Sequence, residues 1–225
     1  MIVIKNPVCY IVGACKDSYD DMCILKKEND LVIAADGGYD ALLKMNITPD
    51  LVLGDFDSVL EFPEHKNVIK YPVEKDDTDT FLAYEAGKKL GYEYFVIYGG
   101  IGGRIDHTIA NIQALSNIAE HSGRAFLLGN GAVMTVIHNS YIEFTEDYKG
   151  KISVFSVGKA SENVKIEGLK YTAQNILLNS NVPLGVSNEF VGERAKISVD
   201  DGNLLIIWYE NPKEFIKNID NFLIK

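Results

Sequence analysis

The chain has little cysteine, little positive charge and no long apolar run. Its three cysteines, Cys9, Cys15 and Cys23, form no C-x-x-C pair among 225 residues. An odd number without such a pair argues against a disulfide framework and predicts free thiols in a reducing cytoplasm. No apolar stretch approaches the length of a transmembrane helix.

Acidic residues outnumber basic ones. Lysine and arginine total 22 against 32 aspartates and glutamates, which gives a formal net charge of −10. Such a chain has no surplus of cations to neutralise a nucleic acid or an anionic membrane, so neither is an expected partner. A phosphorylated small molecule is compatible with this charge if metal ions or a few local cations screen the repulsion.

The remaining composition is that of an ordinary globular protein. Apolar residues make up 47% of the chain and charged residues 24%. The length suits one large domain or two small ones with a substantial core.

The first 130 residues alternate short apolar runs with helix-like stretches. The runs predict strands at 8–12, 31–35, 51–55, 67–72, 94–100 and 125–130, and the other stretches predict helices at 38–46, 78–91 and 104–123. In the last helix, Ile105, Ile109, Ile112, Leu115 and Ala119 fall on one face. This alternation predicts an α/β domain over residues 1–130 with a mostly parallel sheet.

The pattern changes near residue 130. Short strands are predicted at 132–137, 141–144, 151–157, 163–168, 175–179, 195–199 and 203–210, and no amphipathic helix interrupts them before 212–225. We therefore expect a smaller all-β, sandwich-like domain over 131–225 that ends in a helical tail. The motifs give no reason for that tail.

Two short segments of the first domain concentrate five carboxylates. They are Asp55 and Asp57, at the end of one predicted strand, and Asp76, Asp77 and Asp79, between another strand and its helix. Ligands of a parallel sheet gather outside the carboxyl ends of its strands. Both segments, Asp36 and the glycines at 99–103 are therefore expected to converge on one edge.

Carboxylates that lie together without a counter-charge are costly to keep ionised, and a hard divalent cation removes the problem. Mg²⁺ prefers oxygen ligands and completes its shell with water and substrate phosphate. We expect Asp57, Asp76 and Asp79 to bind Mg²⁺, and Asp55 is the next candidate ligand. An alternative is that Asp76, Asp77 and Asp79 only stabilise the N-terminus of the following helix.

The segment GGIGGRIDHT, residues 99–108, is the other dense motif. Its four glycines let the backbone approach a ligand closely, and the N-terminus of the following helix offers N–H groups to an anion. Arg104 supplies a forked cation suited to phosphate. Asp106 and His107 fall in the first helical turn, although His107 alone is equally well explained as a capping or packing residue.

The segment AADGGYDALL has a similar arrangement, in which glycines connect a strand end to a helix. Asp36 ends a strand, and Gly37 and Gly38 turn the chain into a helix, although a purely structural turn gives the same pattern. Together the motifs predict Mg²⁺-dependent chemistry on a phosphorylated ligand, in which Arg104 and Lys75 neutralise phosphate oxygens.

The ordered set DGG, GDFDS, KDDTD and GGRIDH resembles the thiamin pyrophosphokinase family. GLKY at 168–171 and GVSNEF at 185–190 resemble further motifs of that family. The resemblance implies transfer of a pyrophosphoryl group from ATP to the hydroxyl of thiamine, giving thiamine diphosphate and AMP. It also implies a homodimer in which the α/β domain of one subunit and the β domain of the other form each active site.

The resemblance also implies roles for individual residues. The expected catalytic residues are Asp57, Asp76, Asp79, Arg104 and Asp106, and the expected Mg²⁺ ligands are Asp55, Asp57, Asp76 and Asp79. The expected nucleotide-binding residues are Asp36, Gly37, Gly38, Lys75, Gly102, Gly103 and Arg104, and those for thiamine are Ser187, Asn188 and His107. Some members stack thiamine on a late tryptophan, but Trp208, the single tryptophan here, is as well explained as a strand residue.

The implied mechanism is an in-line displacement. Mg²⁺ and Arg104 hold the triphosphate while the thiamine hydroxyl attacks the β-phosphorus and AMP leaves. Asp79 and Asp106 are the candidates to accept the alcohol proton, a role on which a loose transition state makes little demand.

Two other functions fit parts of the sequence. LVLGDFDSV matches the D-x-D-x-V signature of a haloacid-dehalogenase-type phosphatase, with Asp55 as nucleophile and Asp57 as acid and base, but this leaves KDDTD and GGRIDH unexplained. A non-catalytic nucleotide- or thiamine-binding module is the other alternative, although binding alone favours cations around phosphate rather than carboxylates.

Overall fold

The computed structural model describes residues 6–15, 19, 22–56, 63–74 and 76–222. Up to residue 129 it contains β1 (Val8–Val12), β2 (Leu31–Ala35), α1 (Gly38–Lys44), β3 (Leu51–Gly54), β4 (Val68–Lys70), α2 (Asp79–Lys89), β5 (Tyr94–Tyr98), α3 (Ile105–Glu120) and β6 (Arg124–Gly129). Then follow β7 (Ala132–His138), β8 (Tyr141–Phe144), β9 (Lys151–Glu167), β10 (Ala173–Leu178), β11 (Asn188–Glu189), β12 (Ala195–Ser198), β13 (Asp201–Tyr209), α4 (Pro212–Asn218) and the 3-10 helix η2 (Ile219–Phe222).

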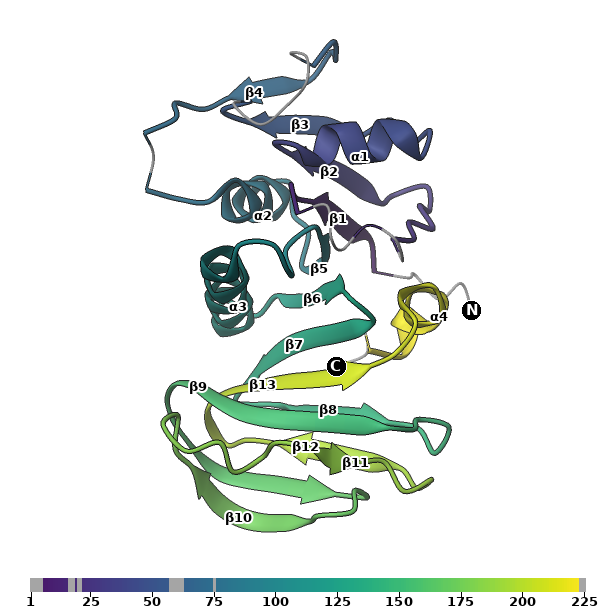
Figure 1. Ribbon diagram of the computed structural model, residues 1–225. Helices are drawn as coiled ribbons and strands as arrows, with labels where there is room; N and C mark the ends of the chain where they lie inside the picture. The colour runs from purple at the N-terminus through teal and green to yellow at the C-terminus, as the bar shows by residue number, and fades with distance from the viewer. Residues whose placement is uncertain (1–5, 16–18, 20–21, 57–62, 75, 223–225) are drawn as a thin grey trace.

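The described strands form one mixed sheet in the order β4-β3-β2-β1-β5-β6-β7-β13-β9-β12-β8, with β10 and β11 also paired to β9 (Figure 1). The described pairings among β1 to β6 are parallel, whereas β6 and β7 pair antiparallel, as do the later strands. Hydrogen bonding therefore continues from the first half of the chain into the second, a continuity that the change of sequence pattern near residue 130 did not predict.

Helices cover both faces of the parallel strands (Figure 1). Because successive side chains of a strand point to opposite faces, Tyr10 joins the core that contains residues of α1, α4 and η2. Its neighbours Cys9 and Ile11 pack in the second core, with residues of α2 and α3. None of the described helices combines the length and apolar character needed to span a bilayer.

Strand β9 corrects one expectation from the sequence. Residues 151–157 and 163–168 were predicted as two strands, but the structure has one strand of 17 residues. Gly158 within it has φ of 80°, so the glycine and polar residues that suggest a turn mark an irregularity inside the strand instead. Its first half pairs with β13 and its second half with β12 and β10.

Helix α3 corrects a second expectation. Its buried residues are Asn111, Ala114, Leu115 and Ile118, so the face toward the sheet is rotated from the one predicted. Ile105 and Ile109 are 75% and 54% exposed. Leu115 is buried as predicted, and Ile112 and Ala119 are partly buried against the same core. Asn111 occupies a buried position that the predicted apolar face did not include.

The C-terminal segment closes one end of the core. Phe215 and Phe222 pack against Phe126 and Trp208, with ring centroids 5.0 to 5.9 Å apart. Trp208 is completely buried, as expected of a strand residue, and its Nε1–H donates to Glu210 Oε2 at 3.1 Å. Packing of the tail onto these rings explains why the chain continues beyond Pro212.

Candidate functional site

A cavity of about 540 Å³ lies at the carboxyl ends of β1, β2, β3 and β5. Its lining comes from the residues at and after the ends of these strands and from the N-terminal halves of α2 and α3. The size and the position are those of a ligand site in an α/β sheet. The expectation that the motifs converge on one edge is thereby confirmed for Asp36, Asp55, Asp79 and the glycine loop. It is not confirmed for Asp76 and Asp77, which are exposed and do not line the cavity.

Seven of the predicted site residues line this cavity. They are Asp36, Asp55, Asp79, Gly102, Gly103, Arg104 and His107. Three carboxylates, a guanidinium and a glycine loop are thus brought together from four separate segments of the chain. Asp76 and Asp106 are exposed and do not line the cavity, and Asp57 and Lys75 lie outside the described residues.

Asp36 is the most buried of the three carboxylates, at 5% exposure. It lies in the left-handed region, with φ of 49°, and its N–H donates to the Leu53 carbonyl at 2.8 Å. A Cβ on Gly54 would come within 3.0 Å of the Asp36 Cα, so a glycine is needed where β3 passes this residue. Asp36 Oδ1 is buried without a hydrogen-bond partner in the described part of the chain, which favours a bound ligand there.

The glycines after Asp36 have a structural role. Gly37 is the N-cap of α1 and Gly38 is its first residue. A Cβ on Gly38 would come within 1.9 Å of the Val12 carbonyl oxygen, so this glycine lets α1 pack directly on β1. Neither glycine lines the cavity.

Arg104 and Asp106 form an exposed ion pair at the start of α3, with Arg104 Nη2 at 2.6 Å from Asp106 Oδ2. The hydrogen bond from Arg104 lowers the pKa of Asp106, and the same bond raises the pKa of Arg104. The N–H of His107 donates to Asp106 Oδ1 at 3.1 Å. Asp106 therefore holds the guanidinium next to the first turn of the helix and beside the cavity.

The start of α2 places Asp79. The hydroxyl of Thr78 accepts a hydrogen bond from the Phe81 N–H at 3.2 Å, which caps the helix. Asp79 follows as the first helical residue. Its carboxylate therefore both lines the cavity and lies where the helix dipole favours negative charge, so the two interpretations of this motif are compatible.

Ser187 and Asn188 lie in the second half of the chain and do not line the cavity. The carboxamide of Asn188 accepts from the Tyr171 N–H at 3.0 Å and donates to the Tyr171 carbonyl at 2.7 Å, which ties the GLKY segment to β11. Ser187 is exposed, with φ of 60°. In Figure 1, β11 lies at the opposite end of the molecule from β3 and β4.

The donor set fits Mg²⁺ bound together with a phosphorylated substrate. In the described residues, which exclude Asp57, no three His, Cys, Asp or Glu side chains are already clustered for a metal. Mg²⁺ commonly takes only one or two protein carboxylates and fills its other positions with water and phosphate oxygens. The carboxylates of Asp55 and Asp79 on one cavity, with the unpartnered oxygen of Asp36, meet that requirement.

Sequence reasoning missed other residues of the cavity, among them Cys15, Thr80 and Asn111. Cys15 follows the first predicted strand, so the strand-end rule used for Asp36 and Asp55 also applies to it. Asn111 gave no signal, because a polar residue inside an amphipathic helix normally faces solvent.

Models of one protein family match both halves of the chain. The catalytic domain of thiamin pyrophosphokinase matches residues 23–127, and the vitamin B1 binding domain of thiamin pyrophosphokinase matches residues 139–204. The chain belongs to the thiamin pyrophosphokinase family.

Relatives within this family match over most of their length. Thiamine pyrophosphokinase from Bacillus subtilis (strain 168) is 28% identical over 205 residues, covering 88% of this chain and 95% of the relative. Thiamin pyrophosphokinase 1 from Caenorhabditis elegans is 23% identical over 193 residues, covering 80% of this chain and 79% of the relative. None of these findings supports the phosphatase or binding-module alternatives.

Crystal structures within the thiamin pyrophosphokinase family share the fold. That of the Bacillus subtilis enzyme has a TM-score of 0.78 at 25% identity and covers 90% of this chain and 99% of that one. A family member from Enterococcus faecalis has a TM-score of 0.76 at 27% identity and covers 91% and 99%. The arrangement of strands and helices is therefore that of the family along nearly the whole chain.

Proposed function

We propose that this protein is a thiamine diphosphokinase, which transfers a pyrophosphoryl group from ATP to the hydroxyl of thiamine and releases AMP. The observation that carries the proposal is the strand-end cavity. In a member of the thiamin pyrophosphokinase family, it brings the carboxylates of Asp36, Asp55 and Asp79 together with Arg104 and the glycine loop.

Mg²⁺ is the metal that this carboxylate set suits. Asp55 and Asp79, with Asp57 and Asp76 from the same two motifs, would hold the ion. When bound, Mg²⁺ would neutralise phosphate oxygens and the charge that develops on departing AMP.

The chain's own groups bind and orient the two substrates. The glycine loop and the first turn of α3 offer backbone N–H groups to the triphosphate, and Arg104 and Lys75 add positive charge. With Asp36, these groups hold the nucleotide so that the β-phosphorus faces the thiamine hydroxyl, which attacks in line. Asp79 and Asp106 are the candidates to accept the alcohol proton.

Thiamine binding is proposed to require a second copy of the chain. Ser187 and Asn188 lie far from the cavity of their own subunit in sheet order. The turn that precedes them exposes Val182, Leu184 and Val186, at 52%, 66% and 46% exposure. We propose a homodimer in which this turn covers the exposed Ile105 and Ile109 of the partner's α3, the helix that begins at the cavity, with His107 beside the thiamine.

Two broader expectations remain proposals. A cytoplasmic location is supported by the three cysteines, which are all free thiols. A division of the chain into a catalytic domain over 1–130 and a thiamine-binding domain over 131–225 is supported by the gap between the two family matches, residues 128–138.

The test is incubation of the purified protein with ATP, Mg²⁺ and thiamine, followed by chromatography of all products. We expect equal amounts of thiamine diphosphate and AMP, and no product in EDTA. Inorganic phosphate without thiamine diphosphate would indicate a phosphatase. ATP binding without turnover would indicate a binding module.

A further inference from the structure

Three successive carbonyl groups of the glycine loop accept hydrogen bonds from the protein. The Gly99 carbonyl accepts from the Cys15 N–H at 3.0 Å. The Gly100 carbonyl accepts from Asn111 Nδ2 at 2.9 Å, and the Ile101 carbonyl accepts from Cys15 Sγ at 3.2 Å. Cys15 and Asn111 thus fix the orientation of three consecutive peptide groups, although glycine leaves their backbone unusually free.

The N–H groups of the same peptides are less completely hydrogen-bonded than the carbonyl groups. In a trans peptide, the carbonyl of one residue and the N–H of the next point in opposite directions. The N–H of Gly102 donates to Thr108 Oγ1 at 3.2 Å. Within the residues that the structure describes, the N–H groups of Gly100 and Ile101 have no protein acceptor. The loop therefore keeps its carbonyl oxygens bound and leaves two adjacent donors without a protein acceptor, of which that of Gly100 belongs to a residue that lines the cavity.

Of the three contacts, the one made by Asn111 comes from helix α3, whereas Cys15 makes the other two. Asn111 is 4% exposed and lies among the apolar residues of that helix that face the sheet. A polar side chain in such a position costs stability unless it is hydrogen-bonded, and its amide donates to the loop. A Cβ on Gly100 would lie 2.8 Å from Asn111 Nδ2, so the glycine makes room for this contact.

We propose that Asn111 is a positioning residue of the nucleotide site, assisted by Cys15. By holding the carbonyl oxygens of Gly99, Gly100 and Ile101 toward the protein, the two residues leave the N–H group of Gly100, which lines the cavity, free to donate to a phosphate oxygen. A phosphate facing carbonyl oxygens is repelled, whereas one facing a backbone N–H group is bound. This assignment rests on the proposed function, because it takes the triphosphate of ATP as the ligand of the loop.

The test compares ATP with adenosine, which lacks the phosphates. Isothermal titration of wild type and Asn111→Ala, each with Mg²⁺, measures both dissociation constants. We expect Asn111→Ala to raise the Kd of ATP about tenfold and to leave that of adenosine unchanged. The KM for ATP should rise in parallel while the KM for thiamine stays the same. A merely structural role would weaken all of these together.

Two further variants keep the test independent of folding. Gly100→Ala retains the amide of Asn111 but displaces it, and Cys15→Ala removes the neighbouring donor, so both should selectively weaken ATP. Asn117→Ala, two turns along α3 and half-buried, is the matched control and should change nothing. Equal losses of ATP and adenosine, or no loss in any loop variant, would overturn the assignment. Failure of the wild-type protein to bind ATP would instead overturn the proposed function on which it rests.

Discussion

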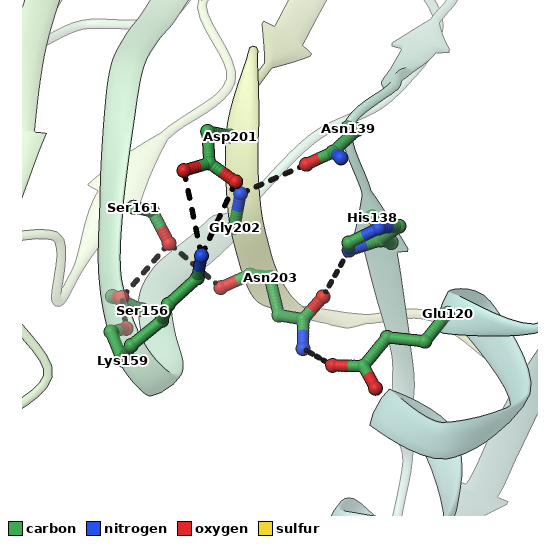
Figure 2. A network of polar contacts seen from close by, with 9 residues as sticks. All are labelled: Glu120, His138, Asn139, Ser156, Lys159, Ser161, Asp201, Gly202 and Asn203. Carbon is green, nitrogen blue, oxygen red and sulfur yellow. Dashed lines mark hydrogen bonds and ion pairs between the residues drawn. The ribbon is translucent and has the colours of Figure 1, made fainter.

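The side-chain amide of Asn203 donates to the carboxylate of Glu120, with Nδ2 at 2.6 Å from Oε1. Its oxygen accepts from the ring of His138, at 2.8 Å from Nδ1 (Figure 2). Because an amide oxygen only accepts, His138 Nδ1 carries the hydrogen. Glu120 is the last residue of α3, His138 is the last of β7, and Asn203 lies in β13. One buried amide therefore joins the helix that begins at the cavity to strands of the second half.

Replacing Asn203 should destabilise the protein without lowering its turnover. Asn203→Ala removes both hydrogen bonds and leaves a gap at a residue of 7% exposure. The expected loss is about 1–2 kcal/mol in the free energy of unfolding, measured by urea denaturation. The exposed Asn181→Ala is the control and should stay within about 0.5 kcal/mol of wild type. An unchanged midpoint for Asn203→Ala would show that these contacts add nothing to stability.

The same amide predicts a pH effect for Asn203→Asp. A second carboxylate beside Glu120 raises the pKa of the pair in the folded state, because like charges disfavour ionisation. Stability that depends on a raised carboxyl pKa is present at low pH and is lost as the pH rises. Asn203→Asp should therefore be closest to wild type near pH 4 and furthest from it near pH 7. A deficit that is constant with pH would contradict this account.

The sequence predicted the candidate site better than it predicted packing. Asp36, Asp55 and the glycine loop were placed by the rule that ligands lie at the carboxyl ends of parallel strands, which depends only on strand order and direction. Asp79 followed from the helix start. These features are local in sequence, so the pattern of apolar runs was enough to locate them.

The parts that were missed depend on contacts between distant segments. The buried face of α3 was predicted only in part, because Ile105 and Ile109 have the right period but are exposed. Asn111, whose polar side chain argued against burial, is buried and bonded to Gly100. The length of β9 was missed because Gly158 resembles a turn unless the pairing with β13 is known. Neither contact can be predicted from the residues that are close in sequence to the one it affects.

Glu210 should make stability depend on pH. Burial raises its pKa above the usual value of 4.5, although hydrogen bonds from Trp208 and Tyr148 oppose the shift. The protonated form is then favoured in the folded state, so its contribution is present below pH 4.5 and is lost as the pH rises through the folded pKa. The free energy of unfolding of Glu210→Gln, relative to that of wild type, should therefore increase as the pH rises from 4.5 through the folded pKa of Glu210. Above that pKa the difference should stay constant.

Denaturant unfolding at a series of pH values measures this gain, with the emission of Trp208 as the signal. The exposed Glu162→Gln is the matched control and should follow the wild-type curve at every pH. A Glu210→Gln curve parallel to wild type from pH 4 to pH 8 would rule out a raised pKa at this position.

The effect on kcat of replacing a carboxylate of the KDDTD motif should depend on whether that carboxylate lines the cavity. Asp79 lines the cavity, whereas Asp77 is exposed and does not. Asp79→Asn should lower kcat at least about 100-fold, because it removes charge next to the metal and phosphates. Asp77→Asn, which makes the same chemical change two residues away, should retain wild-type kcat, and both proteins should remain folded.

The neighbouring aspartates complete that comparison. Asp57→Asn is expected to match Asp79→Asn, since both are predicted Mg²⁺ ligands. Asp76→Asn tests whether an aspartate that is exposed and outside the cavity lining takes part in the reaction at all. Full activity in Asp79→Asn would remove that residue from the catalytic set, and a dead Asp77→Asn would show that the motif acts through its total charge.

A site shared between two subunits predicts complementation. Asp79→Asn disables the cavity, and Ser187→Tyr fills the proposed thiamine pocket, so each variant alone should be inactive. In a mixed dimer, one site receives both changes and the other receives neither. Refolding equal amounts together should therefore restore roughly a quarter of wild-type activity, since half of the dimers are mixed and each has one intact site.

The control for this experiment is a mixture of Asp79→Asn with Asp55→Asn. Both changes lie in the same cavity, so every site in a mixed dimer carries one of them and no activity should return. Leu184→Glu gives an independent measurement, because a charge on the exposed turn should convert the dimer to a monomer in light scattering and abolish turnover. If Asp79→Asn and Ser187→Tyr stay inactive when mixed while light scattering shows that they associate, Ser187 does not serve the cavity of the partner. The thiamine pocket would then have to be sought within one chain, among the residues that line its own cavity.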